Sequence, residues 1–197
     1  MIPTMTERQF PARLLCILFS AAILSPACSH ADNHSLDEKT SAALDAAIAG
    51  AHRSDSNRAR DQYRRPKETL AFFGFRSDMA VVEISPGGGW YTEILAPALR
   101  NGGTFYAAHS DVNGSSYGRR SLGGFLRKLG ENGDVYVQVV VTSSPIAPAN
   151  SADLVVNFRY VHKWLDPESD ATARFAEMYA ALKPGGVLGV VDHRWPD

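Results

Sequence analysis

The sequence predicts one α/β domain in which helices cover both faces of a mostly parallel sheet, a doubly wound architecture. From residue 78 onward, valine-rich apolar runs alternate with segments of helical pattern. The runs lack the polar alternation of half-buried strands, as expected for parallel strands buried on both faces. The 197 residues, 45% hydrophobic and 21% charged, also suffice for one globular core.

The first 27 residues are predicted to be a signal peptide. Two arginines precede an apolar run at 14–24 that is too short to span a bilayer as a helix. Ser-Pro-Ala at 25–27 has the small-x-small pattern of a cleavage site, and Cys28 follows directly. We therefore expect an exported, periplasmic protein. Cys28 resembles the acylated cysteine of bacterial lipoproteins, so a membrane tether through a lipid anchor on Cys28 and a soluble mature chain are the two processing outcomes that the sequence leaves open.

Residues 28–57 are predicted to form an N-terminal polar segment and a helix, the helix covering about 39–52. Residues 58–197 form the predicted α/β domain. The arginine-rich stretch 52–65 fits a solvated linker, or a lid or anion clamp beside a ligand pocket. Pro66 is expected to open a further helix.

Five strands and three later helices are expected within the domain. The strands are predicted at 79–85, 104–109, 135–141, 152–161 and 187–193, and the helices at 90–100, 119–130 and 171–183. The last strand ends four residues before the end of the sequence.

The charge balance argues against non-specific binding to nucleic acid or anionic lipid, because 20 Lys and Arg face 21 Asp and Glu. No nucleic-acid partner is expected. No metal site is expected either, since the histidines show no i, i+4 pair on a predicted domain helix and no cysteine ligands accompany them.

The stretch 81–95 is the most informative part of the sequence. A buried strand leads through Gly87–Gly89 to a helix N-terminus, where a ligand can approach free backbone N–H groups. A phosphate loop would need Gly-Lys-Ser/Thr, but Trp90 and Tyr91 follow the last glycine. A dinucleotide fingerprint would place Thr92 where close helix packing favours glycine.

The run Glu83-x-Ser85-x-Gly87-x-Gly89 resembles motif I of class I S-adenosylmethionine-dependent methyltransferases, with Ser85 in place of the first glycine. Segments from about 58 to 194 also resemble a bacterial group of exported, predicted methyltransferases. The resemblance implies a Rossmann-like fold with S-adenosylmethionine as cofactor. The implied cofactor-binding residues of the motif are Glu83, Ser85, Gly87, Gly88 and Gly89.

In this superfamily an acidic residue at the end of the second strand holds the ribose hydroxyls. Here His109 occupies that position, and Asp111 follows two residues later. Because a carboxylate readily accepts hydrogen bonds from hydroxyls, Asp111 is the predicted ribose ligand.

The superfamily also continues beyond its fifth strand with a helix and a hairpin. This sequence ends at Asp197, so the predicted sheet lacks the C-terminal hairpin strands and its fifth strand forms an edge. Truncation, a dimer that pairs these edges, and a different strand order are the explanations we consider.

Methyl transfer needs alignment of the nucleophile, and a base when the nucleophile carries a proton. Open α/β sheets bind ligands at the carboxyl ends of their strands, where His162 follows the fourth strand. His162 is the predicted general base, because imidazole titrates near neutral pH. His193 is the second catalytic candidate. Its neighbour Asp192 is not expected to share its site, since adjacent strand residues point to opposite faces.

The predicted function is S-adenosylmethionine-dependent methyl transfer to an unidentified small-molecule or lipid-like acceptor. Trp90, Tyr91 and Trp164 are candidates for an aromatic wall around a ring of the cofactor or acceptor. Because this cofactor is made in the cytoplasm, an exported chain could instead be a non-enzymatic periplasmic ligand-binding protein that retains the fold.

A serine hydrolase is the remaining alternative. The sequence 114–118 matches the G-x-S-x-G nucleophile motif, with Ser116 as nucleophile. Asp153 or Asp192 with His162 or His193 would complete a triad.

Overall fold

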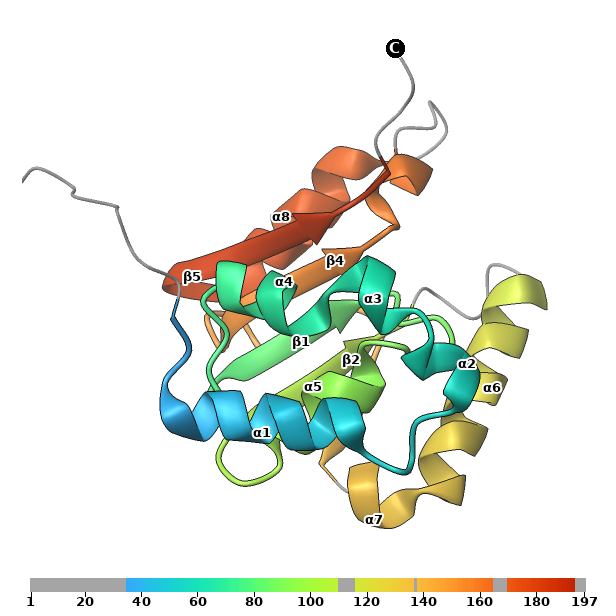
Figure 1. Ribbon diagram of the computed structural model, residues 1–197. Helices are drawn as coiled ribbons and strands as arrows, with labels where there is room; N and C mark the ends of the chain where they lie inside the picture. Colours follow the sequence, from blue (N-terminus) through green and yellow to red (C-terminus); the bar gives the residue numbers. More distant parts are fainter. Residues whose placement is uncertain (1–34, 110–115, 137, 165–169, 194–197) are drawn as a thin grey trace, which may run out of the picture. The chain divides into compact units, whose positions relative to one another are not determined.

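The computed structural model describes residues 35–109, 116–136, 138–164 and 170–193. Within these residues five strands form one sheet in the order β3-β2-β1-β4-β5 (Figure 1). They are β1 (Ala80–Ile84), β2 (Thr104–Ala108), β3 (Val139–Thr142), β4 (Ala152–Phe158) and β5 (Leu182–Val191). All neighbouring pairs are parallel. The predicted doubly wound α/β fold is therefore confirmed.

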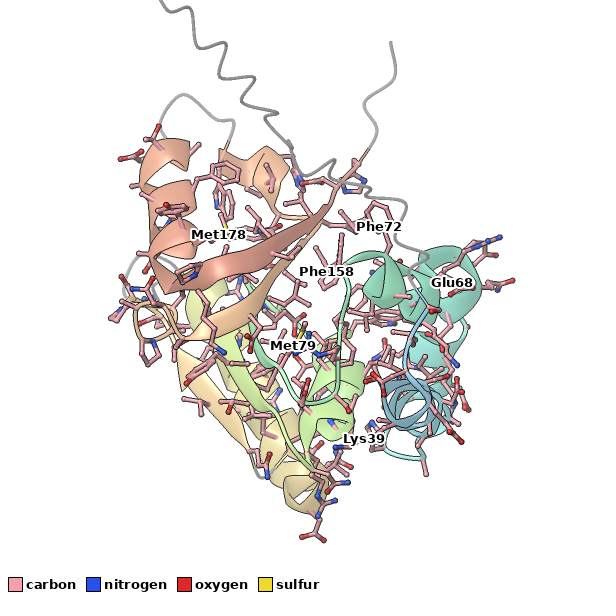
Figure 2. The ribbon with its side chains drawn as sticks, turned by 90° about the vertical axis from the view of Figure 1, so that its left-hand side faces the viewer. Lys39, Glu68, Phe72, Met79, Phe158 and Met178 are labelled. Carbon is pink, nitrogen blue, oxygen red and sulfur yellow. The ribbon has the colours of Figure 1, made fainter. Side chains whose placement is uncertain are left out.

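Helices pack on both faces of this sheet, as Figure 1 shows. They are α1 (Glu38–Ala49), α2 (Asp55–Arg58), α3 (Asp61–Arg64), α4 (Pro66–Phe72), α5 (Thr92–Leu99), α6 (Ser116–Glu131), α7 (Gly133–Tyr136), the 3₁₀ helix η1 (Val161–Trp164) and α8 (Ala171–Ala181). Met79 and Phe158 belong to the core between the sheet and α1, α4 and α5, whereas Met178 belongs to the core beneath α8 (Figure 2). No described helix is long and apolar enough to cross a membrane.

The third strand is shorter than the sequence predicts. The apolar pattern predicts a strand over 135–141, but β3 begins at Val139 and Tyr136 ends α7. The Tyr136 ring is buried edge-on to His52, with 5.9 Å between ring centroids. Tertiary packing therefore overrides the strand propensity of this segment.

The arginine-rich stretch 52–65 folds into α2 and α3 rather than forming an extended linker. Arg53 is fully buried, which corrects the expectation of a solvated stretch. Its guanidinium donates to both carboxylate oxygens of Asp61, at 2.7 and 2.8 Å. This bidentate pair therefore joins the segment before α2 to the first residue of α3.

A buried carboxylate joins three segments at the start of α5. Glu93 lies 3.5 Å from Arg53 Nε and accepts hydrogen bonds from Asn57 Nδ2 at 2.9 and 3.0 Å. Lys128 of α6 donates to Glu93 at 2.6 Å and to the carbonyl of Gly88 at 2.5 Å. We call these four side chains, Arg53, Asn57, Glu93 and Lys128, the Glu93 network.

The α5 helix contains Pro97, which has no N–H to donate to the carbonyl four residues earlier. That carbonyl belongs to Glu93, and His52 Nε2 lies 2.7 Å from it. Because a carbonyl only accepts, the ring nitrogen must carry the proton. His52 thus satisfies the acceptor that Pro97 leaves without a helical donor.

In the described sheet β5 is an edge strand that pairs with β4. Val187, Val190 and Val191 are 42, 41 and 37% exposed. Leu182 pairs with Ala152, and pairing resumes at Val187 after an irregularity in the register. The edge position agrees with the expectation that the fifth strand forms an edge of the sheet.

Replacing Arg53 with Met should lower the free energy of unfolding by about 3 kcal/mol, because it removes the buried guanidinium that pairs with both oxygens of Asp61 and lies 3.5 Å from buried Glu93. Arg76→Met is the matched control, since Arg76 and Asp78 form an exposed pair 3.1 Å apart. We expect the control to lose less than about 1 kcal/mol. Urea denaturation measures both values, and equal losses would contradict a special role for the buried guanidinium.

Candidate active site

The glycine loop is shaped by left-handed backbone conformations. Ser85 has φ 50°, Gly87 has φ 57° and Gly89 has φ 73°. A Cβ at Gly89 would lie 3.1 Å from the Phe125 ring, so this position also has little space for a side chain. Ser85 occupies a conformation that glycine adopts far more readily, which explains physically why the related motif has glycine there.

Glu83 ends up buried beneath this loop, near the end of β1. Thr92 Oγ1 donates to its carboxyl oxygen at 2.6 Å. Burial raises the pKa of Glu83 to about 7, against the opposing effects of the Thr92 hydrogen bond and the charge of Lys128. Its carboxyl group can therefore hold or release a proton near neutral pH.

His109 follows β2 and is buried against Phe125, with 4.5 Å between the ring centroids. Its backbone N–H donates to Thr142 O at 2.8 Å, but its Nε2 is buried without a hydrogen-bond partner among the described residues. Burial lowers the pKa of His109 to about 4, so the ring is neutral at pH 7. The predicted ribose ligand Asp111 lies outside the described residues.

A cavity of about 710 Å³ opens at the carboxyl ends of β1, β4 and β5. Among the predicted site residues, those lining it are Glu83, Ser85, Gly87, Gly88 and His193. His109 also lines it. Gly89 and His162 are outside the lining, so the structure brings most but not all of the predicted site together.

Asp192 and His193 line this same cavity, which corrects the expectation that they face different sites. The strand ends at Val191, so strand alternation does not apply to the two residues beyond it. Asp192 accepts from His162 Nδ1 at 2.8 Å and from the His162 backbone N–H at 3.0 Å. His162 is thus held by the end of β5, and its ring lies 5.2 Å from that of His193.

Hydrogen bonding keeps Asp192 ionised. Burial raises the pKa of this carboxyl, but hydrogen bonds from the backbone of His162 and His193 and from the His162 ring outweigh it and hold the pKa below its usual value. The carboxylate fixes Nδ1 of His162 as the protonated ring nitrogen, leaving Nε2 as the acceptor.

These three side chains offer ligand atoms that lie within 4.8 Å of one another. The lack of an i, i+4 histidine pair on a helix says nothing about a metal site whose residues come together from η1 and the end of β5. Arg159 Nη2 lies 3.2 Å from His193 Nε2. A guanidinium at this distance disfavours a second positive charge at His193, whether on a bound metal ion or on a protonated ring.

The aromatic wall differs from the predicted one in one member. Trp90 and Tyr91 line the cavity, and Tyr91 stacks on Phe158 with 3.4 Å between ring centroids. Trp164 instead packs in the core beneath α8, against Tyr160 and Phe175. Phe158 therefore takes the place that the sequence assigned to Trp164.

Four arginines line the cavity: Arg60, Arg64, Arg65 and Arg159. We call them the arginine cluster. The first three belong to the stretch for which the sequence suggested an anion clamp. Arg159 was missed, although its position directly after β4 is one where open sheets bind ligands.

The described residues around the G-x-S-x-G motif at 114–118 lack the strand–turn–helix context of a hydrolase nucleophile. Ser116 is the first residue of α6, whereas β2 ends at Ala108, so no described strand runs directly into the motif. Asp153 accepts from the backbone N–H of Ala80, at the opposite end of the sheet from the cavity. The structure does not support a nucleophile elbow here.

Residues 82–190, more than half of the chain, match a family described as a methyltransferase domain. A SAM-dependent methyltransferase from Aquifex aeolicus is 22% identical with a TM-score of 0.55, and the match covers 68% of this chain and 66% of that one. YcgJ protein from Bacillus subtilis is 17% identical with a TM-score of 0.51, covering 66% and 51%. The chain thus spans between about half and two thirds of these proteins. No curated protein matches the sequence.

The parallel sheet and the glycine loop after β1 have the Rossmann-like architecture that these methyltransferase structures share. The chain belongs to the methyltransferase-domain family, which confirms the family resemblance found in the sequence. Neither the hydrolase nor the non-enzymatic alternative is supported by these findings. The exported character of the resembled group stays a prediction.

The raised pKa of Glu83 makes stability depend on pH. Between pH 4.5 and 7 the native state holds a proton that the unfolded chain releases, so stability is lost as pH rises through this range. Glu83→Gln removes this loss and keeps an acceptor for Thr92. We expect the variant to match the wild type near pH 4.5 and to be roughly 3 kcal/mol more stable above pH 7. Urea denaturation across this range, with exposed Glu68→Gln as control, would refute the assignment if the difference were independent of pH.

Proposed function

We propose that this chain transfers a methyl group from S-adenosylmethionine to a small-molecule acceptor in the cavity beside the glycine loop. The observation that carries the proposal is the turn from β1 to α5, which presents bare backbone to a cavity large enough for a ligand. Membership of the methyltransferase family and the shared fold support it.

The residues present fit this cofactor. A Cβ placed on Gly88 would meet no atom within 4 Å, and one on Gly87 would meet none closer than Ser85 O at 4.0 Å, so both backbones are open to a ligand. His109 presents a buried ring nitrogen that lacks a partner among the described residues. We assign Gly87 and Gly88 to the methionine part and Glu83 and His109 to polar groups of the nucleoside.

When bound, S-adenosylmethionine supplies an electrophilic methyl group on a sulfonium centre. The chain's own task is to orient the acceptor and to receive its proton. His193 lines the cavity and is the better placed base, while Asp192 orients the neighbouring His162. Because Arg159 donates to His193 Nε2 at 3.2 Å, the ring receives the proton there after that guanidinium turns away. His193→Gln should slow transfer of radiolabelled methyl at least tenfold with cofactor affinity within twofold of wild type. An unchanged rate would remove His193 from this role.

Cofactor binding can be tested without knowing the acceptor. Gly88→Leu places a side chain at the cavity while leaving the fold room to accept it. Calorimetry should show S-adenosylmethionine binding to the wild type more tightly than about 1 mM, and at least tenfold weaker binding to this variant. Gly130→Leu on α6, where an added Cβ also meets nothing within 4 Å, is the control. Absence of binding to the wild type would overturn the proposed function.

We also propose that the chain is exported. The proposal rests on the pattern of residues 1–28, which lie outside the described residues. Mass spectrometry of protein from the periplasmic and membrane fractions should find a chain that begins at Cys28, and its mass distinguishes a free from an acylated cysteine. Recovery of the intact 197-residue chain in the cytoplasm would contradict export.

A further inference from the structure

We propose that the methyl acceptor carries an anionic group, a carboxylate or a phosphate, and that the arginine cluster binds it. This inference rests on the proposed function, because it names the substrate class of the same site. It draws on five observations: where the arginines come from, what pairs with them, how close they lie to one another, their backbone conformation and their position relative to the glycine loop.

The arginine cluster is assembled from separate parts of the chain. Arg60 precedes α3, Arg64 lies in it, Arg65 joins it to α4, and Arg159 follows β4. All four line one cavity although nearly a hundred residues separate the first three from the last. A solvated charge run does not require such convergence, whereas a binding site does.

The cluster's positive charge lacks a matching negative charge. Among the described residues no carboxylate forms an ion pair with any member. The carboxyl groups in the cavity lining, Glu83 and Asp192, are hydrogen-bonded to Thr92 and to His162. An anionic ligand would supply the missing charge, and a guanidinium binds carboxylate or phosphate in a bidentate manner.

The arginines are also close enough to repel one another. Burial, then the charges of Arg60 and Arg159, lower the pKa of Arg64. Its guanidinium lies 4.5 Å from the centre of the Trp90 ring, which holds it within the lining. The chain therefore keeps like charges together, an arrangement that an anion would stabilise.

Two members of the arginine cluster also have strained backbone conformations. Arg65 has φ 41° and Arg159 has φ 60°, in the left-handed region that favours glycine. Of the four described non-glycine residues with positive φ, three line the cavity, the third being Ser85. Such conformations cost stability and concentrate at functional sites, so their coincidence with two guanidinium groups points to a use for those groups.

The sheet order separates this anion site from the cofactor's nucleoside. His109 follows β2 and Arg159 follows β4, which flank β1 and its glycine loop on opposite sides. A cofactor that reaches from the glycine loop toward His109 leaves the β4 side for the acceptor. Tyr91 and Phe158 stack there, beside the arginines, and offer an apolar surface for the rest of that molecule.

Phenyl phosphate tests this inference, with phenol as its uncharged counterpart. Calorimetric titrations use the full chain, with and without saturating S-adenosylhomocysteine. The test variant is Arg60→Gln with Arg65→Gln. The matched control, Arg120→Gln with Arg127→Gln, removes the same charge from exposed positions of α6 outside the cavity lining.

We expect phenyl phosphate to bind at least tenfold more weakly to the test variant and within twofold of wild type to the control. Phenol should bind the wild type and the test variant alike, and S-adenosylhomocysteine should do so within twofold. Phenyl phosphate that fails to bind the wild type, or binds the test variant equally well, overturns the inference.

A second arm separates the acceptor from the cofactor's own carboxylate. If the test variant weakens binding of S-adenosylmethionine but not of its decarboxylated form, the cluster holds the cofactor and the inference is wrong. If no nucleoside binds the wild type, the proposed function fails, while the phenyl phosphate titration without nucleoside still decides whether the anion site exists.

Discussion

Glu93 is a buried carboxylate shared by three segments that are far apart in the sequence. Arg53 comes from the segment after α1, Asn57 from α2 and Lys128 from α6, and Lys128 also bonds the glycine loop at Gly88. Such buried ionic groups contribute little net stability against a well-packed apolar alternative, but losing one partner is costly. We infer that their role is positional. Both α2 and α6 contribute residues to the cavity lining, so one buried carboxylate helps to position two parts of its wall.

The site itself combines several locally unfavourable features. Glu83 is buried with a pKa of about 7, and Ser85 adopts a left-handed backbone. A buried ring nitrogen of His109 also lacks a partner in the described structure. Each of these lowers the stability of the unliganded chain, and together they surround one cavity. A ligand that supplies hydrogen bonds there would recover part of that stability. The recovered part would contribute to the free energy of ligand binding.

The sequence was sufficient for the fold and for the strand–glycine–helix unit, because periodicity and glycine spacing act locally. It could not reveal that Arg53 is buried, since the partners that make burial tolerable are Asp61 and the distant Glu93. It also misjudged Asp192 and His193, because a shift of two residues in the end of β5 changes which side chains can meet. Arg159 escaped notice for a similar reason, as only the folded sheet brings it to the arginines before α4.

Pro97 and His52 are linked through the backbone carbonyl of Glu93. An imidazole from outside α5 donates to the carbonyl that a helical residue would ordinarily satisfy. A chain with an ordinary residue at 97 would turn that N–H toward the same oxygen and make the imidazole redundant, while a chain that lost only the imidazole would leave the oxygen unsatisfied. The effects of substitutions at the two positions on the free energy of unfolding should therefore be non-additive. The proline in α5 thus frees the carbonyl that holds His52, and with it the loop that leads into α2, against α5.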